Sequence, residues 1–157
     1  MKKALFAFLL WGLCCGAAAA ADDYRWIGQI TEDGAALRYG IPDSDAIKID
    51  FHCDRATKKI AVSYEHEPKD AKDGMRLTLR LSARGRGPAD GIAFAVSGER
   101  LALDDKFVLQ GEIRMSPQLR RILAADGVLR VEAGGLVEEI PLPGAGRAAR
   151  QLFATCP

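Results

Sequence analysis

The sequence predicts a mainly β protein: an antiparallel β-sandwich or partly open barrel with two short helices, the C-terminal one linked to the sheet by a disulfide. Three observations predict this class. Apolar and polar residues alternate with period two in many short runs. Clusters of Gly, Pro and Asp separate these runs. Two cysteines, Cys53 and Cys156, remain once an N-terminal targeting segment is set aside.

Residues 1–21 have the features of a cleaved signal peptide. Two lysines precede an apolar run that ends in consecutive alanines. The run is shorter than the about 20 residues that a membrane anchor needs, and neither cysteine within it has the neighbours of a lipid-accepting cysteine. We therefore predict a periplasmic or secreted protein with no transmembrane span after cleavage, and a single domain over 22–157.

The predicted strands follow one another along the chain. In 47–53 the alternation turns Cys53 toward the core and His52 toward solvent. The pair Gly134 and Gly135 has the spacing of a two-residue hairpin turn. The strands are expected at 26–30, 37–39, 47–53, 59–65, 77–81, 92–97, 101–103, 107–115, 128–132 and 136–142.

Two helices are expected among the strands. Ser116 followed by Pro117 is typical of a helix N-terminus, and Gly127 closes that segment. The second helix is predicted at about 145–155, where apolar residues recur every three or four positions. This spacing places Cys156 on the buried side of the helix.

An even number of cysteines in an exported chain indicates a disulfide, because oxidising compartments keep thiols paired. The prediction is a bond between Cys53 and Cys156 that closes a loop of roughly 100 residues, which stabilises a domain by about 4 to 5 kcal/mol. The alternative is two buried free thiols.

Composition and motifs argue against several function classes. The chain has a formal net charge of +1, and two of its lysines lie in the predicted signal peptide, so no overall field favours nucleic acid or an anionic membrane. There is no Gly-x-Ser-x-Gly motif, no phosphate-binding glycine loop and no Cys-x-x-Cys in the predicted mature chain. We therefore expect a protein that is not an enzyme and has no cofactor.

The two histidines form the first candidate site. If 47–53 and the following strand pair as a hairpin, His52 approaches Glu65 or Glu67, with His66 beside them. Imidazole and carboxylate groups are ligands for zinc or copper. The alternative is a solvated cross-strand charge pair.

A row of arginines forms the second candidate site. Arg76, Arg80, Arg84 and Arg86 follow one strand and the loop after it. Guanidinium groups suit carboxylate and phosphate, so this row is a candidate for contact with an acidic glycan, a lipid headgroup or an acidic partner. The alternative is a solvated strand face whose arginines pair with nearby carboxylates.

Aromatic residues near the start of the predicted mature chain form the third candidate. Tyr24, Trp26 and Tyr39 are expected either to line a shallow recognition surface or to close one end of the core.

Taken together, these residues resemble a group of small exported bacterial β-domains that includes type VI secretion accessory proteins of the VasI or TagO kind. The shared pattern is Trp26, a strand ending in Cys53, a second strand directly after it, and a final helix with Gly144, Ala148 and Cys156. The chain also resembles, more distantly, proteins of the invasion-associated locus B type. The resemblance implies an exported two-cysteine β-domain and supplies no catalytic residue.

The expected function is that of a non-catalytic exported binding or accessory protein. Its partner is expected to be an envelope or secretion-system protein or a cell-wall component. One alternative is a small periplasmic metal-binding protein or hydrolase that uses His52 and His66. Another is an inhibitor or immunity protein against an exported enzyme.

Overall fold

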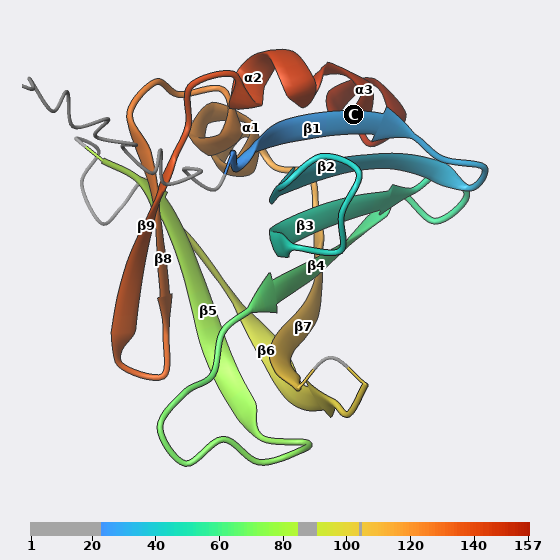
Figure 1. Cartoon of the computed structure of the whole chain (residues 1–157). Coiled ribbons are helices and arrows are strands. Elements are labelled where there is room, and N and C mark those ends of the chain that lie inside the picture. Colours follow the sequence, from blue (N-terminus) through green and yellow to red (C-terminus); the bar gives the residue numbers. More distant parts are fainter. Residues whose placement is uncertain (1–22, 85–90, 104) are drawn as a thin grey trace, which may run out of the picture.

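The structure, a computed structural model, describes residues 23–84, 91–103 and 105–157. Within these ranges, nine antiparallel strands form one sheet that curls into a half-barrel, and three short helices accompany it (Figure 1). This confirms the predicted fold class in its partly open barrel form. The predicted signal peptide 1–21 lies outside the described residues, and in the described part no helix is long and apolar enough to cross a membrane.

The elements agree closely with the alternating runs of the sequence. The strands are β1 (Arg25–Ile30), β2 (Gly34–Gly40), β3 (Ile47–Asp54), β4 (Lys59–Glu65), β5 (Arg76–Ala83), β6 (Ile92–Leu101), β7 (Lys106–Arg114), β8 (Val128–Ala133) and β9 (Leu136–Pro141). The helices are α1 (Pro117–Leu123), α2 (Ala145–Ala148) and α3 (Arg150–Thr155).

The strand order across the sheet is β1-β2-β3-β4-β7-β6-β5-β8-β9. Strands β1 to β4 are neighbours in sequence as well as in space, and so are β5, β6 and β7. Two pairings join distant parts of the chain: β4 with β7, where Val62 lies opposite Gly111, and β5 with β8, where Leu81 lies opposite Val131. Strands β1 and β9 are the two ends of the sheet.

The core lies on the concave face of the curled sheet. Strand β3 shows how the sequence specifies it, because Ile49, Phe51 and Cys53 are fully buried while the residues between them are partly exposed. The helices cover this core from one end of the half-barrel (Figure 1). Helix α1 contacts β5, and α3 contacts β1, β2 and β3. The buried residues of α1 are Leu119, Ile122 and Leu123.

The local signals of the sequence act as predicted at the start of α1 and at the β8–β9 turn. The hydroxyl of Ser116 accepts a hydrogen bond from the Leu119 N–H and so caps α1. Gly134 and Gly135 have φ angles of 58° and 81°, as a two-residue hairpin turn requires.

Two predicted boundaries differ from the structure. The separate strand predicted at 101–103 is wrong, because Leu101 is the last residue of β6 and the chain then turns toward β7. Asp105 in that turn has a φ of 50°, which interrupts the extended backbone. The predicted C-terminal helix is divided into α2 and α3 at Ala149, although its apolar stripe is buried as expected.

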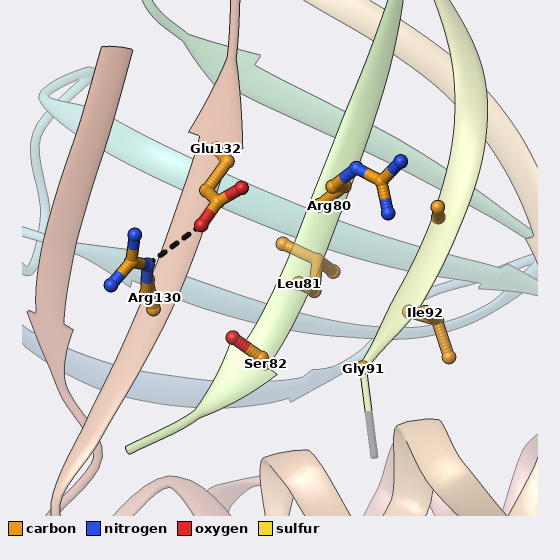
Figure 2. Close-up of a pocket in the computed structure, with 8 residues that line it drawn as sticks. Arg80, Leu81, Ser82, Gly91, Ile92, Arg130 and Glu132 are labelled. Carbon is orange, nitrogen blue, oxygen red and sulfur yellow. Dashed lines mark hydrogen bonds and ion pairs between the residues drawn. The ribbon is translucent and has the colours of Figure 1, made fainter. Parts of the chain in front are cut away.

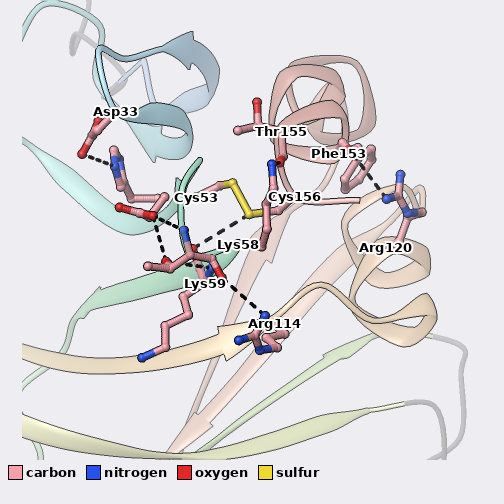
Figure 3. Close-up of a disulfide and its surroundings, with 12 residues drawn as sticks. Asp33, Cys53, Lys58, Lys59, Arg114, Arg120, Phe153, Thr155 and Cys156 are labelled. Carbon is pink, nitrogen blue, oxygen red and sulfur yellow. Dashed lines mark hydrogen bonds and ion pairs between the residues drawn. A yellow bond between two sulfur atoms is a disulfide. The ribbon is translucent and has the colours of Figure 1, made fainter.

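A disulfide joins the end of β3 to the residue after α3, as predicted (Figure 3). Cys53 and Cys156 are 103 residues apart in sequence, their Cα atoms are 6.1 Å apart, and both side chains are buried. Beside the bond, the Lys58 Nζ donates a hydrogen bond to the Thr155 carbonyl oxygen, 3.0 Å away. The cross-link therefore holds the C-terminal helix on the sheet.

The two end strands of the sheet differ in how they are covered. Helices α2 and α3 pack against β1, and the contact is so close that a Cβ on Gly28 would lie 2.0 Å from the Ala148 carbonyl oxygen. The indole Nε1 of Trp26 on β1 donates a hydrogen bond to the Pro141 carbonyl oxygen, 2.6 Å away. Strand β9 pairs only with β8.

Candidate functional site

A shallow groove crosses the convex face of the sheet over β5, β6 and β8. Its hollow has a volume of about 510 Å³, within the range of small-ligand sites. Figure 2 shows the groove and the side chains that form it. The lining residues are Arg80, Leu81, Ser82, Gly91, Ile92, Ala93, Arg130 and Glu132.

The groove results from the alternation of inward and outward side chains on β5 and from the residues that lie opposite them on β6 and β8. Leu79 and Leu81 point into the core, so the side chain of Arg80 between them points outward. In the sheet register, Arg80 lies opposite Ala93 on β6 and opposite Glu132 on β8. The small side chain of Ala93 leaves the surface low on one side of Arg80.

Only one of the two arginines that line the groove has a carboxylate partner among the described residues. Glu132 accepts a hydrogen bond from the Nε of Arg130, 2.7 Å away. In Figure 2 the guanidinium of Arg80 extends toward the strand that carries Ile92, away from this ion pair. Across the described ranges, neither Arg80 nor Arg76 makes an ion pair or a side-chain hydrogen bond. Among the residues that the structure describes, no carboxylate pairs with Arg80, so this part of the groove presents a positive charge.

A second hollow, of about 210 Å³, continues the groove toward the turn between β8 and β9. It shares Arg80, Arg130 and Glu132 with the first hollow. Thr78 on β5 and Val137 on β9 also line it. The groove thus crosses four neighbouring strands, β6, β5, β8 and β9, and ends at the hairpin turn.

The predicted arginine row is only partly assembled on this face. Arg76 and Arg80 are exposed on β5 and alternate with the buried residues, as predicted. Arg84 lies past the end of β5, where its Nη1 is 3.8 Å from a carboxylate oxygen of Glu139. Arg86 lies outside the described residues.

Sequence reasoning missed Arg130 and Glu132 as parts of the groove. Their alternation with buried residues does predict that both side chains point outward on β8. Nothing in the alternation places β8 beside β5, because that pairing joins segments about 50 residues apart.

The structure does not assemble the predicted histidine site. His52 lies opposite Ala61 in the β3–β4 register, and its Nε2 is 3.2 Å from a carboxylate oxygen of Asp33. Glu65 pairs with Lys106 and Glu67 with Arg100. In the parts of the chain that the structure describes, no group of three or more His, Cys, Asp or Glu residues could hold a metal ion.

The Asp33 carboxylate beside His52 is held in its charged form. A hydrogen bond from the Thr31 hydroxyl is the main cause that lowers its pKa, and hydrogen bonds from its own backbone N–H and from His52 add to it. Asp33 lies in the turn between β1 and β2, so this pair joins that turn to β3 and differs from both predicted arrangements of His52.

His66 belongs to a different polar cluster, formed with Tyr64, Lys48 and Glu138. Its ring stacks on the ring of Tyr64, whose hydroxyl donates a hydrogen bond to Glu138 on β9. The ammonium of Lys48 on β3 is 3.2 Å from the same carboxylate and lies over the Tyr64 ring. Burial and the hydrogen bond to Glu138 raise the pKa of Tyr64, so its hydroxyl stays protonated. This cluster joins β3 and β4 to β9 across the open side of the sheet.

The environment of His66 favours the neutral imidazole. Its Nε2 atom is buried and has no hydrogen-bond partner among the described residues. Burial lowers the pKa of His66, the positive charge of Lys48 lowers it further, and Glu138 acts in the opposite direction.

This shift predicts a loss of stability in mild acid. Because the pKa of His66 is lower in the folded chain than its ordinary value of 6.5, the unfolded chain takes up a proton first as the pH falls through about 6.5. We therefore expect the free energy of unfolding, measured in urea, to be lower at pH 5.5 than at pH 7.5. His66→Phe, which keeps a stacked ring, should show a smaller decrease. An equal decrease in this variant would contradict the interpretation.

The aromatic candidates lie far from the groove in the strand order: Trp26 is on β1, Tyr39 is on β2, and Tyr24 directly precedes β1. The ring centroid of Tyr39 is 5.5 Å from that of Tyr24 and 5.3 Å from that of Trp26. Trp26 is 8% exposed, and its indole N–H is bonded to β9. Trp26 therefore closes one end of the core, which was the alternative to a recognition surface.

A further hollow on the convex face, of about 230 Å³, has paired charges at its centre. The Nε of Arg38 is 2.9 Å from a carboxylate oxygen of Asp50. Burial raises the pKa of Asp50, and Arg38 acts in the opposite direction. Lys106, at its rim, pairs with Glu65. The groove around Arg80 is thus the better candidate for a site that takes up an external charged group.

No protein-family model, curated protein or solved structure matches this chain. The candidate site is therefore interpreted from its own geometry and charge.

Proposed function

We propose that this chain is a non-catalytic exported binding protein whose groove around Arg80 recognises an acidic polysaccharide of the cell envelope. One observation carries the proposal: two exposed arginines on the same face of β5, Arg76 and Arg80, have no carboxylate partner in the described chain. One of them, Arg80, lines the hollow of about 510 Å³ on this face. A ligand with negative charges would supply the missing partners.

The chemistry of the guanidinium group supports a carboxylate or phosphate ligand. Arginine presents a planar fork of N–H donors that matches the two oxygens of such a group. Arg80 is well placed for this contact because Ala93 leaves free space beside it. The ion pair of Arg130 and Glu132 beside it supplies further donors and acceptors suited to sugar hydroxyls.

The spacing of the arginines favours a polymer over a small molecule. Arg76 and Arg80 are four residues apart on one strand, a distance of about 13 Å at 3.3 Å per residue. A single small anion cannot contact both. An extended chain with a negative charge on successive sugars can do so while lying in an open groove.

The test is binding of a carboxylated glycan to paired variants. Arg76→Ala combined with Arg80→Ala is expected to weaken binding of oligogalacturonate at least tenfold, since hydrogen bonds to charged groups contribute about 1.5–3 kcal/mol each. Wild-type affinity should also fall steeply with salt. Isothermal titration calorimetry measures both effects.

A matched control removes the same charge elsewhere. Arg25 on β1 and Arg147 on α2 are both exposed, and replacing both with alanine should leave the affinity within about twofold of wild type. The proposal is wrong if the two double variants lose affinity equally, or if wild type binds oligogalacturonate no better than a neutral maltooligosaccharide.

A further inference from the structure

We infer that strand β9 is a docking edge that accepts an extended segment of a partner protein as an added antiparallel strand. The segment has an apolar residue opposite Val137 and a basic residue opposite Glu139. This inference concerns the backbone edge of β9 and does not depend on glycan binding, although Val137 also borders the far end of the groove. Its basis is the contrast between the two ends of the sheet.

The first end strand of the sheet, β1, is covered over its middle, while Gln29 and Ile30 at its end are exposed. Helices α2 and α3 pack against β1, and the backbone of Ala148 leaves no room for a side chain on Gly28. Trp26 in the same strand is buried and hydrogen-bonded to Pro141. Coverage of this kind is one of the ways in which proteins prevent an end strand from pairing with another chain.

In the described parts of the chain, no helix packs against the other end of the sheet as α2 and α3 do against β1. Among the described residues β9 pairs with β8 alone, so alternate residues of β9 direct their backbone groups away from the sheet. Pro141 at the end of the strand is an exception, because it has no N–H and its carbonyl oxygen accepts the Trp26 hydrogen bond. Leu136 is 48% exposed and Val137 is 51% exposed. These two adjacent residues are half of the large apolar residues that are exposed within the described ranges. The edge thus combines free backbone groups with apolar side chains, as strand-addition sites do.

Strand β9 carries two glutamates and no lysine. Glu138 is turned inward to Tyr64 and Lys48, so Glu139 is the acidic side chain that β9 presents on its convex face. That polar cluster fixes the position of β9 relative to β3 and β4, so the edge is held in place before a partner arrives. A preformed edge lowers the entropy cost of binding.

Charge explains why the occupant is a different protein rather than a second copy of this chain. Two antiparallel registers pair five residues of β9 with the same strand of another copy, and they place either Glu138 or Glu139 opposite its own equivalent. Like charges directly opposite each other destabilise a strand pair.

The charge of Glu139 favours a basic residue in the incoming strand. On the convex face, the Glu139 side chain is 45% exposed, and its one ion-pair partner among the described residues is Arg84, 3.8 Å away. A lysine or arginine from an incoming strand complements it, two residues from an apolar side chain at Val137.

The test uses the full chain and short labelled peptides in fluorescence polarisation. The first probe is a seven-residue threonine-rich peptide in which Lys and Val are two residues apart. A second probe has Glu in place of Lys. We expect wild type to bind the lysine peptide and to bind the glutamate peptide several-fold more weakly. Of two further lysine peptides, N-methylated at odd or at even positions, one should lose binding, because only alternate N–H groups face β9 in an added strand.

Variants locate the peptide on the sheet. Val137→Lys should weaken binding of the lysine peptide at least tenfold while leaving the thermal unfolding midpoint nearly unchanged, since Val137 is half-exposed. The matched control is Gln29→Lys on β1, an exposed residue of the opposite end strand, which should bind as wild type does. The glycan-binding variant with Arg76 and Arg80 replaced should also bind the peptide normally, so the two proposals can fail separately.

Several outcomes would overturn the inference. The first is that wild type and Val137→Lys bind the lysine peptide equally. The second is that both N-methylated peptides bind as well as the unmodified one. The third is that the lysine peptide does not bind wild type. Dimerisation of wild type in analytical ultracentrifugation that Val137→Lys abolishes would assign the edge to a second copy and also contradict it.

Discussion

Replacing both Cys53 and Cys156 with alanine is expected to lower the free energy of unfolding by about 4–5 kcal/mol. The bond joins residues 103 positions apart, and a cross-link over a loop of that length removes much of the conformational freedom of the unfolded chain. The effect is a large share of the 5–15 kcal/mol that typically stabilises a folded domain. Urea-induced unfolding followed by circular dichroism measures the change.

Reduction of the wild-type protein provides the control for the disulfide variant. A reductant should shift the wild-type unfolding curve to that of the double alanine variant and should leave the variant itself unchanged. The Cys53→Ala and Cys156→Ala single variants should be about as unstable as the double variant, because each removes the same bond. A double variant within about 1 kcal/mol of wild type would contradict this account of the C-terminal helix.

Truncating Phe51 to alanine is expected to cost about 3–5 kcal/mol of folding free energy. Phe51 is fully buried in the middle of β3, on the concave face of the sheet. Its removal takes apolar surface out of the core and leaves a cavity that the surrounding strands cannot fill without moving. The measurement is again the urea unfolding curve at neutral pH.

Phe153 provides a matched control for this truncation. It is the same residue type, but it lies on α3, is only partly buried and packs under the guanidinium of Arg120, 4.7 Å from the ring centroid. Phe153→Ala is expected to cost less than half as much as Phe51→Ala. Equal costs would mean that the core is not centred on the concave face of the sheet.

Much of the fold could be predicted because its signals are local. In β3 the alternation of buried and partly exposed residues is the alternation of the sequence, since a strand turns successive side chains to opposite faces. The start of α1 follows from a serine hydroxyl that satisfies a free backbone N–H. The β8–β9 turn follows from two glycines that adopt positive φ angles easily.

The arrangement of the strands could not be predicted, because it depends on contacts between distant segments. Alternation states which face of a strand is buried but not which strand lies beside it. The pairing of β5 with β8 places Arg130 and Glu132 next to Arg80, and no residue in either strand indicates that partner. The same limit applies at 101–103, where three residues are too few to distinguish a strand from a turn.

In the candidate site, too, the features set by local sequence could be predicted and those set by strand pairing could not. The outward direction of Arg76 and Arg80 follows from period two alone, and the structure confirms it. The histidine site failed because it depended on register: His52 lies opposite Ala61, four residues short of Glu65. The link of Lys48 and Tyr64 to Glu138 crosses from one side of the curled sheet to the other, which becomes apparent only once the sheet is assembled.

The strand order also has a consequence for folding kinetics. Strands β1 to β4, β5 to β7, and β8 with β9 are groups of sequential hairpins, which close short loops and form quickly. The pairings of β4 with β7 and of β5 with β8 join these groups over much longer stretches of chain, so we expect them to limit the rate. Until they form, β4, β5, β7 and β8 each have an open edge, and aggregation competes with folding during that interval.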